Sequence, residues 1–466
     1  MQHTTTTLTL SELLLPAGKT FMSLFASVES NPWSLLFDTS QSKQSDGRFN
    51  MIMVNPAKVV VAQQGTICII DTTDNSHKTS HDKPLAAVSA LVENLKQTVK
   101  INNKTDVDLE SLPFIVGAAG LCGYDLGRYY ETLPNVAEGG YACPDMAMGI
   151  YLHCVIEDTL TGRIFETKRP ECQSILDYDV GVHKNKRPFA LTCEWQSNMT
   201  QSQYTQNLTR VHDYLVAGDC YQINFAQRFN ASYEGSEWQA YLSLREANKA
   251  PFSSFMRLPE SCILSISPER FISTKHGDVE TKPIKGTRPR SDNKEEDNRL
   301  ANALLNAEKD RAENLMIVDL LRNDISKHCE PGSVTVPHLF SLESYNAVHH
   351  MVSTVKGKLK PSSSCFDLLS GAFPGGSITG APKIRAMEII DELEPHQRNI
   401  YCGSMVYLGI FGDMDSSICI RTLLAENNTL YCWAGGGIVL DSNAKDEYQE
   451  TLDKVSRILP ILASEK

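Results

Sequence analysis

Residues 434–455 of the chain read AGGGIVLDSNAKDEYQETLDKV, a glycine run followed by a charged segment with helical spacing. Three consecutive glycines let a backbone approach a ligand closely, because glycine has no Cβ. In the helix that we expect over residues 444–461, Glu447, Glu450 and Lys454 share one face. By pattern alone, such a face is more often solvated and held by Glu–Lys pairs than functional. The run does not match a dinucleotide-binding fingerprint, which needs a further glycine.

A second glycine-rich segment, PGGSITGAPK at residues 374–383, opens another expected helix. Backbone N–H groups and the helix dipole at such a start attract an anion. The segment fails the P-loop pattern, since lysine and serine or threonine do not directly follow Gly380. A carboxylate is therefore a more suitable ligand for this segment than a triphosphate. The alternative is that the segment binds no anion and is only a tight turn with a helix cap.

Three carboxylates and one lysine are candidates for the chemistry itself. Glu313, near the start of an apolar helix expected at 311–322, could bind Mg²⁺ together with Glu450, because this ion takes one or two carboxylates plus waters and substrate oxygens. Lys285 is expected at the end of a buried strand (279–284), where neighbouring cations would favour its free, nucleophilic amine. Burial of Glu269 beside another apolar strand would suit it to general acid catalysis. The alternatives are a helix N-terminal charge for Glu313, a surface charge for Lys285 and a salt bridge for Glu269.

The composition limits the class of protein. The chain has 466 residues, 41% of them hydrophobic, which is enough for a large core without disulfides or metals. Acidic residues outnumber basic ones by 56 to 44, and the net charge of −12 argues against a nucleic-acid partner. The 13 cysteines include no Cys-x-x-Cys pair, which predicts free thiols in a reducing cytoplasm. We find no signal peptide and no apolar stretch of membrane-helix length, so we expect no membrane association.

Strand and helix patterns mix without the regular alternation of a doubly wound sheet, which favours an α+β fold. The polar, broken stretch 166–200 indicates a connection between an N-terminal region, 1–165, and a second region, 201–466. The second region begins with a helix from about Tyr204 to Leu215.

Four segments, in order, closely resemble the chorismate-utilising enzymes: Ser267 to Phe271, Asp310 to Asp324, Gly371 to Glu394 and Ala434 to Lys454. The resemblance implies the chorismate-utilising fold, with two facing, mainly antiparallel β-sheets surrounded by helices and a Mg²⁺-dependent site between them. It also implies that residues 201–466 bind chorismate, and that residues 1–165 are similar to the N-terminal region of anthranilate synthase component I.

The resemblance implies a role for each matching residue. Glu313 and Glu450 are the expected metal ligands, and Glu447 would act through a metal-bound water. Glu269 would protonate the leaving hydroxyl, and Lys285 would be the covalent nucleophile. The expected substrate contacts are Gln222, His350, Ser377, Thr379, Arg421, Gly435, Gly436 and Lys454.

Two positions select a branch of the family. Members that use water carry lysine where this chain has Gln222, and an amide cannot act as that base, so ammonia is the expected nucleophile. Anthranilate-forming members carry alanine where this chain has Lys285, whereas members that aminate chorismate at C4 carry lysine. The resemblance thus implies conversion of chorismate and ammonia to 4-amino-4-deoxychorismate, for p-aminobenzoate and folate, with ammonia supplied by a partner glutaminase. An anthranilate-forming enzyme is one alternative, and a non-catalytic, tryptophan-binding scaffold for a glutaminase is another.

A tryptophan pocket is a further implication of the resemblance. Feedback-inhibited relatives bind tryptophan near a Leu-Leu-Glu-Ser stretch, where this chain has LLFDT at residues 35–39. The residues expected at the pocket are Thr39, Pro251, Phe252 and Ser253.

Overall fold

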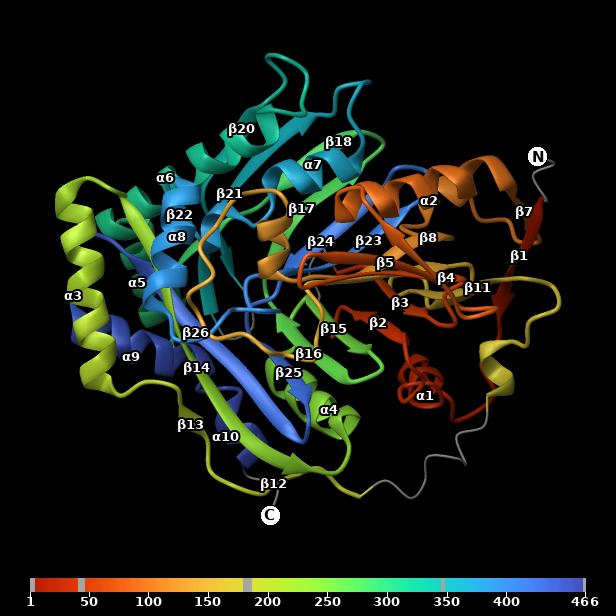
Figure 1. The fold of residues 1–466 in the computed structure, drawn as a ribbon, viewed down its shortest axis with the longest axis horizontal. Helices are drawn as coiled ribbons and strands as arrows, with labels where there is room; N and C mark the ends of the chain where they lie inside the picture. Colours follow the sequence, from red (N-terminus) through yellow and green to blue (C-terminus); the bar gives the residue numbers. More distant parts are fainter. Residues whose placement is uncertain (1–4, 41–46, 179–186, 345–347, 464–466) are drawn as a thin grey trace.

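Two large β-sheets face each other, and helices lie against their outer sides (Figure 1). The structure is a computed structural model, which describes residues 5–40, 47–178, 187–344 and 348–463. Among the strand pairs of these residues, one is parallel and the others are antiparallel. The predicted α+β architecture with two facing, mainly antiparallel sheets is therefore confirmed. No helix in the described ranges is long and apolar enough to cross a membrane.

The first sheet contains 14 strands, of which two short ones pair with β14 off the main path. The main path runs through β12 (Ala190–Leu191), β14 (Gln222–Glu234), β26 (Thr429–Ile438), β25 (Thr422–Glu426), β16 (Ser261–Ser267), β15 (Phe252–Arg257), β2 (Leu35–Asp38), β3 (Phe49–Met53), β10 (Cys154–Asp158), β11 (Arg163–Lys168), β1 (Thr6–Leu13) and β7 (Val99–Asn103). The two short strands are β13 (Gln196–Ser197) and β22 (Gly380–Ala381).

The second sheet contains 12 strands, of which one pairs with β21 off the main path. The main path runs through β19 (Ile284–Pro289), β21 (Val348–Lys358), β18 (Asp278–Thr281), β17 (Arg270–Lys275), β24 (Met414–Ile418), β23 (Ser404–Gly409), β8 (Gly117–Cys122), β9 (Met146–Tyr151), β4 (Lys58–Gln63), β5 (Thr66–Asp71) and β6 (Ser76–Ser80). The strand off the path is β20 (Thr335–Ser344).

Both sheets combine early and late parts of the sequence. In the first sheet β2 pairs with β15, and in the second β8 pairs with β23. The three predicted segments, 1–165, 166–200 and 201–466, therefore contribute to shared sheets, and their separate roles stay a prediction.

The α-helices of the described residues are α1 (Phe21–Ala26), α2 (Pro84–Thr98), α3 (Gln201–Ala217), α4 (Glu237–Asn248), α5 (Lys294–Leu305), α6 (Glu308–Ser326), α7 (Cys365–Ala372), α8 (Lys383–Leu393), α9 (Ala444–Val455) and α10 (Leu459–Ala463). Among the described residues, five of these α-helices begin at a side-chain N-cap: α1, α3, α5, α7 and α9. The predicted helix near Tyr204 is confirmed by α3, which starts with a capping box at Thr200 and ends at Gly218 with φ of 80°. The single helix predicted over 444–461 is wrong. It is divided into α9 and α10, because Pro460 has no N–H to continue the helical ladder and its ring crowds the carbonyl four residues earlier.

One large apolar core joins residues of the two sheets. Phe37 of β2 packs edge to face on Tyr407 of β23, with ring centroids 5.4 Å apart, so side chains of the two sheets meet directly. On the outer side of the first sheet, Tyr204 of α3 packs on Phe225 of β14 at 5.1 Å. The second contact holds α3 against the end of the first sheet that carries β14 and β26.

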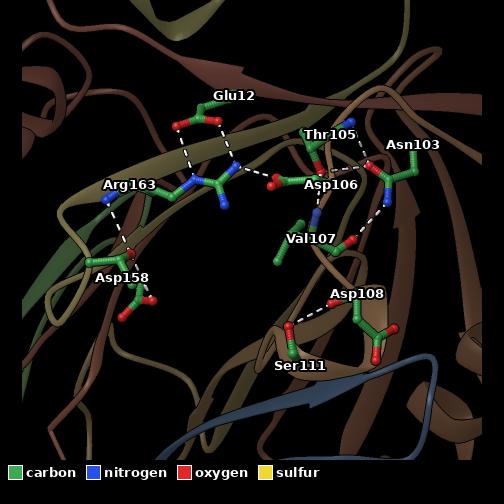
Figure 2. Close-up of polar contacts among 10 residues, drawn as sticks. Glu12, Asn103, Thr105, Asp106, Val107, Asp108, Ser111, Asp158 and Arg163 are labelled. Carbon is green, nitrogen blue, oxygen red and sulfur yellow. Dashed lines mark hydrogen bonds and ion pairs between the residues drawn. The ribbon is translucent and has the colours of Figure 1, made fainter.

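The opposite edge of the first sheet is closed by polar contacts (Figure 2). Arg163 of β11 donates from Nε and Nη2 to the Glu12 carboxylate of β1, at 3.1 and 2.7 Å. Its Nη2 also donates to Asp106, in the loop after β7. The carboxamide of Asn103 holds that loop by donating to the carbonyl of Val107 at 2.8 Å. The Arg163–Glu12 ion pair is partly exposed, so it adds little to the stability of the whole fold and mainly orders this edge of the sheet.

Candidate active site

A cavity of about 500 Å³ collects most of the predicted site residues. Its walls come from β19 and β21 of the second sheet, from β26 of the first sheet, and from α6 and α9. The predicted residues that line it are Glu269, Lys285, Glu313, His350, Ser377, Arg421, Gly435, Glu447, Glu450 and Lys454. Residues far apart in the sequence thus meet at one place, between the two sheets.

Three predicted substrate contacts lie just outside the cavity lining. Gln222 is fully buried, and a Cβ built on Gly437 would lie 2.3 Å from its Nε2. Neither amide atom of Gln222 has a hydrogen-bond partner among the described residues. Thr379 is also fully buried, and its hydroxyl donates to the carbonyl of Gly375 at 3.0 Å, which closes its own turn. Gly436 lies beside the carboxylates of α9 described below.

Glu269 sits between β16 and β17 and is 7% exposed. Burial raises the pKa of its carboxyl to about 7, against the opposing influence of Lys285, Lys454 and Arg421. Near neutral pH this carboxyl therefore exists in both protonation states. That property suits a general acid.

Lys285 is the second residue of β19, not the end of the preceding strand as the sequence predicted. The apolar run is interrupted at Pro283, which lies between β18 and β19. The pairing of β19 with β21 shifts register between Lys285 and Thr287, and Gly286 has φ of 76° there. A Cβ at Gly286 would lie 2.7 Å from Leu304 Cδ1, so glycine is required both by conformation and by space.

The charges around Lys285 differ from the prediction. The cations expected to crowd it are paired with acids: Lys282 with Glu280, Arg288 with Asp310 and Arg290 with Asp297. Lys285 instead faces carboxylates, because its charge acts to lower the pKa of Glu269, Glu313 and Glu450.

Three carboxylates from two helices converge on the cavity. Lys309 Nζ lies 3.9 Å from Glu313 Oε1 and 3.4 Å from Glu447 Oε1, so α6 and α9 bring these groups within reach of one cation. A Cβ on Gly436 would lie 3.3 Å from Glu447 Oε2 and 3.2 Å from Glu450 Oε1. Glycine at 436 therefore leaves room for both carboxylates.

The donor chemistry of this carboxylate group fits Mg²⁺, which takes oxygen ligands and often binds through one or two carboxylates. In the described part of the chain, no group of three or more His, Cys, Asp or Glu side chains is already arranged to hold a metal ion. Burial raises the pKa of Glu313. Burial acts in the same direction on Glu450, but Lys454 at 2.6 Å, together with Lys285 and Lys309, outweighs it and the pKa of Glu450 is lowered.

The remaining walls combine cations with aromatic rings. Arg421 and Lys454 line the cavity, and Lys454 Nζ donates to the carbonyl of Gly435 at 2.7 Å. Tyr401 and Trp433 stack with an interplanar angle of 6°. The cavity thus offers both positive charge and a flat apolar surface, which suits an anionic ring.

His350 adds a neutral group to this wall. Burial, with a further contribution from Arg421, lowers the pKa of His350 to about 4, so the imidazole is neutral near pH 7. Its Nδ1 lies 2.8 Å from the hydroxyl of Thr287. A neutral imidazole in this position can exchange hydrogen bonds with a ligand without adding charge.

Some lining residues were not predicted. Lys309 stands one helical turn before Glu313, so the i, i+4 spacing could have indicated it. Asn224 stands two residues after Gln222 on β14 and so shares its face of the strand. Trp433 lies in a strand rich in buried residues and carried no signal that separated it from core residues.

A second cavity, of about 300 Å³, lies where β2, β15 and β17 approach β23 and β24. The predicted pocket residues Thr39, Pro251, Phe252 and Ser253 all line it. The carboxylate of Asp38, in the same lining, is already bound by Arg245 and by the hydroxyl of Tyr241.

The site therefore combines clustered carboxylates, a lysine and further cations in one cavity between two sheets. The chain belongs to the chorismate binding enzyme family, whose model matches residues 37–460. It is 47% identical over 447 residues to aminodeoxychorismate synthase component 1 of Salmonella typhimurium, with 93% of this chain and 94% of that protein covered.

Solved structures agree on the fold. Anthranilate synthase component I from Streptococcus pneumoniae superposes with a TM-score of 0.75 at 31% identity, covering 90% of this chain and 93% of that chain. The menaquinone-specific isochorismate synthase of Escherichia coli superposes with a TM-score of 0.72 at 15% identity, covering 99% of this chain and 96% of that chain. At that identity the second likeness concerns the fold alone.

Proposed function

We propose that the protein converts chorismate and ammonia to 4-amino-4-deoxychorismate, as the synthase component of an aminodeoxychorismate synthase. The observation that carries this proposal is the presence of Lys285 in the same cavity as Glu269 and the carboxylates Glu313 and Glu450. The similarity to a protein of that name, at 47% identity, supports it over the anthranilate-forming alternative, whose representatives are 30–33% identical to this chain. The intact set of cavity carboxylates argues against a non-catalytic scaffold.

In the proposed reaction, the free amine of Lys285 forms a bond to C2 of chorismate. The ring double bonds shift, and the C4–O bond breaks as Glu269 protonates the departing hydroxyl, which leaves as water. Ammonia then bonds to C4, the double bonds shift back, and the amine of Lys285 leaves C2. Two displacements replace hydroxyl by amine with retained configuration, in the manner of covalent catalysis.

We propose the following roles for the remaining residues. Arg421 and Lys454 bind the substrate carboxylates together with Ser377 and the Gly435 backbone, and His350 contacts the ring hydroxyl. Gln222, whose amide is buried and without a partner among the described residues, orients ammonia. Thr379 and Gly436 shape the walls. Mg²⁺ would be held by Glu313 and Glu450, with Glu447 acting through a water, and would supply positive charge to the ring carboxylate.

The partner and the compartment follow from the same proposal. Ammonia would come from a glutaminase subunit, component II. All 13 cysteines are free thiols, which supports a reducing cytoplasm as the location.

We also propose tryptophan as the ligand of the second cavity, because Thr39, Pro251, Phe252 and Ser253 line one space of suitable size. Calorimetric titration with tryptophan tests this, and absence of binding would refute it.

The experiment that tests the main proposal incubates the purified chain with chorismate, Mg²⁺ and ammonium at mildly alkaline pH and identifies the product by mass. The expected product is an amine that keeps the enolpyruvyl group. Anthranilate would establish the first alternative, and no turnover with saturating ammonium would favour the scaffold.

A further inference from the structure

A buried ion pair lies directly behind one wall of the active-site cavity. Arg398 is 1% exposed, and Glu394, at the C-terminal end of α8, is 4% exposed. Their charged groups meet in two parallel hydrogen bonds, from Nε to Oε2 at 2.9 Å and from Nη2 to Oε1 at 2.6 Å. Neither residue lines the cavity, and the proposed reaction uses neither.

The guanidinium also binds the backbone of the cavity wall. Nη1 donates to the carbonyl of Ile378 at 2.9 Å, and Nη2 donates to the carbonyl of Asn224 at 2.5 Å. Ile378 belongs to the 3₁₀ turn η5 (Gly376–Ile378), which carries Ser377, and Asn224 lies on β14. The Glu394 carboxylate accepts a further bond from the N–H of Ala226 on β14, at 2.9 Å. One ion pair therefore joins the turn and the strand from behind.

The same guanidinium reaches a third part of the wall. It lies 5.5 Å from the ring centroid of Tyr401, which lines the cavity and stacks on Trp433. The ring of Tyr124 lies on it as well, at 4.9 Å.

We propose that Arg398, held by Glu394, is a positioning residue that sets the spacing of the Ser377 turn and Asn224 for chorismate binding. The inference rests on the proposed function, in which Ser377 contacts a substrate carboxylate. A buried ion pair adds little stability over apolar residues of the same volume, so stability alone does not account for this pair. The turn and the strand are also joined by the Asn224 N–H, which donates to the carbonyl of Thr379 at 2.8 Å, so loss of the pair would loosen the wall without removing it.

Arg128 offers a matched control. It donates to Asp125 at 3.0 Å and to Asp391, which also lies on α8. Its hydrogen-bond partners among the described residues, Asp125, Asp391 and the carbonyl of Pro134, all lie outside the cavity lining. Arg128 and Arg398 border the same small hollow, but only Arg398 touches the wall; the Arg128 side chain is also more exposed, at 21% against 1%.

The test uses a double variant that carries both Arg398→Met and Glu394→Met. It is compared with the single variant Arg128→Met and with the wild type. Calorimetric titration with chorismate and Mg²⁺, without ammonium, gives the Kd, and each protein carries Lys285→Ala for this titration so that no covalent adduct forms. With Lys285 intact, steady-state kinetics give the KM for ammonium and a thermal melt reports folding. We expect the double variant to bind chorismate at least about tenfold more weakly, with an unchanged KM for ammonium, because small displacements of positioning groups are costly. Arg128→Met should melt at lower temperature and bind chorismate like the wild type.

Unchanged chorismate binding by the folded double variant would overturn the inference, as would equal losses in the double variant and the Arg128 control. If the double variant does not fold, Arg398→Lys decides, because lysine keeps the pair with Glu394 but cannot reach both carbonyl oxygens. It should weaken chorismate binding, and unchanged binding would again overturn the inference. If the wild type does not bind chorismate, the proposed function fails. If the wild type binds chorismate and the variants bind it equally well, only the inference about Arg398 fails.

Discussion

The buried carboxyl of Glu269 links stability to pH. The unfolded group titrates near 4.5, whereas burial raises the pKa in the folded protein to about 7. Between these values only the unfolded chain is ionised, so the free energy of unfolding falls as pH rises from 4.5 to 7 and stays low above that range. The difference between the two pKa values corresponds to about 3 kcal/mol.

We therefore expect Glu269→Gln to be more stable than the wild type at pH 8 by up to about 3 kcal/mol, with the gain vanishing near pH 4. Urea unfolding at the two pH values measures this directly. An identical difference at both values would show that the carboxyl does not titrate as the geometry indicates.

Lys285 should form a covalent bond to the substrate. With chorismate and Mg²⁺ but no ammonium, the intact mass of the wild type should rise by chorismate less water, and Lys285→Ala should show no increase. The same variant should lose at least about a hundredfold of its turnover, because the two-displacement route is closed. Lys282→Ala removes a neighbouring lysine that pairs with Glu280 and is the control. Full turnover by Lys285→Ala would exclude the nucleophile role.

The carboxylates of α6 and α9 should control metal affinity. Glu313→Gln and Glu450→Gln should each weaken Mg²⁺ binding by roughly tenfold or more in a calorimetric titration, since each removes an oxygen ligand of full charge. Asp319→Asn, on the same helix as Glu313 but 79% exposed, should leave it unchanged. Excess EDTA should abolish turnover, and full activity in EDTA would contradict both assignments.

At the residue scale, sequence reasoning found those side chains whose type and motif carry chemistry, and most of them line one cavity. It missed residues that matter through position alone. Lys309 could have been inferred from its spacing to Glu313, but Arg398 stands in no motif, and its contacts with β14 and η5 exist only in three dimensions.

At the element scale, the irregular pairing of β19 with β21 aims Lys285 into the cavity. Gly286 stands at this irregularity with φ of 76°, a conformation that costs a residue with a Cβ about 1–2 kcal/mol. The sequence placed a strand near this point but could not place the break at Pro283, because apolar periodicity does not report register. The division between α9 and α10 is different, because Pro460 is visible in the sequence and could have predicted it.

Gly286→Ala should therefore reduce turnover by about tenfold or more although Lys285 is intact, because alanine is strained at this positive φ and its methyl group would also displace the Leu304 side chain. Gly277→Ala is the control, since that glycine also has a positive φ, of 79°, but lies in the turn between β17 and β18, and a Cβ there has ordinary contacts. Chorismate turnover and thermal melts of both variants check this. If Gly286→Ala and Gly277→Ala lose turnover equally, the loss comes from backbone strain at a positive φ and not from the position of Lys285.

At the scale of the whole molecule, the shared sheets predict cooperative unfolding. Fragments 1–178 and 187–466 should each lack a cooperative melt, because β2 and β8 in one lose their partners β15 and β23 in the other. Circular dichroism melts of each fragment, with the mixed fragments as control, measure this. A cooperative transition in the isolated N-terminal fragment would show that it folds alone. Sequence patterns indicated two regions here, since they report composition along the chain and not which strands pair across it.

The pairing of β8 with β23 also bears on how the protein is synthesised. One edge of β8 cannot pair until residues 404–409 have been synthesised and have left the ribosome. At about 5–20 residues per second, this delay is tens of seconds. During that interval one edge of β8 is unpaired, although every residue of this strand is buried in the folded protein. An unpaired strand edge can associate with other chains. Chaperones that shield this edge during translation should therefore raise the yield of folded protein, and slow codons downstream of residue 122 should lower it by lengthening this interval.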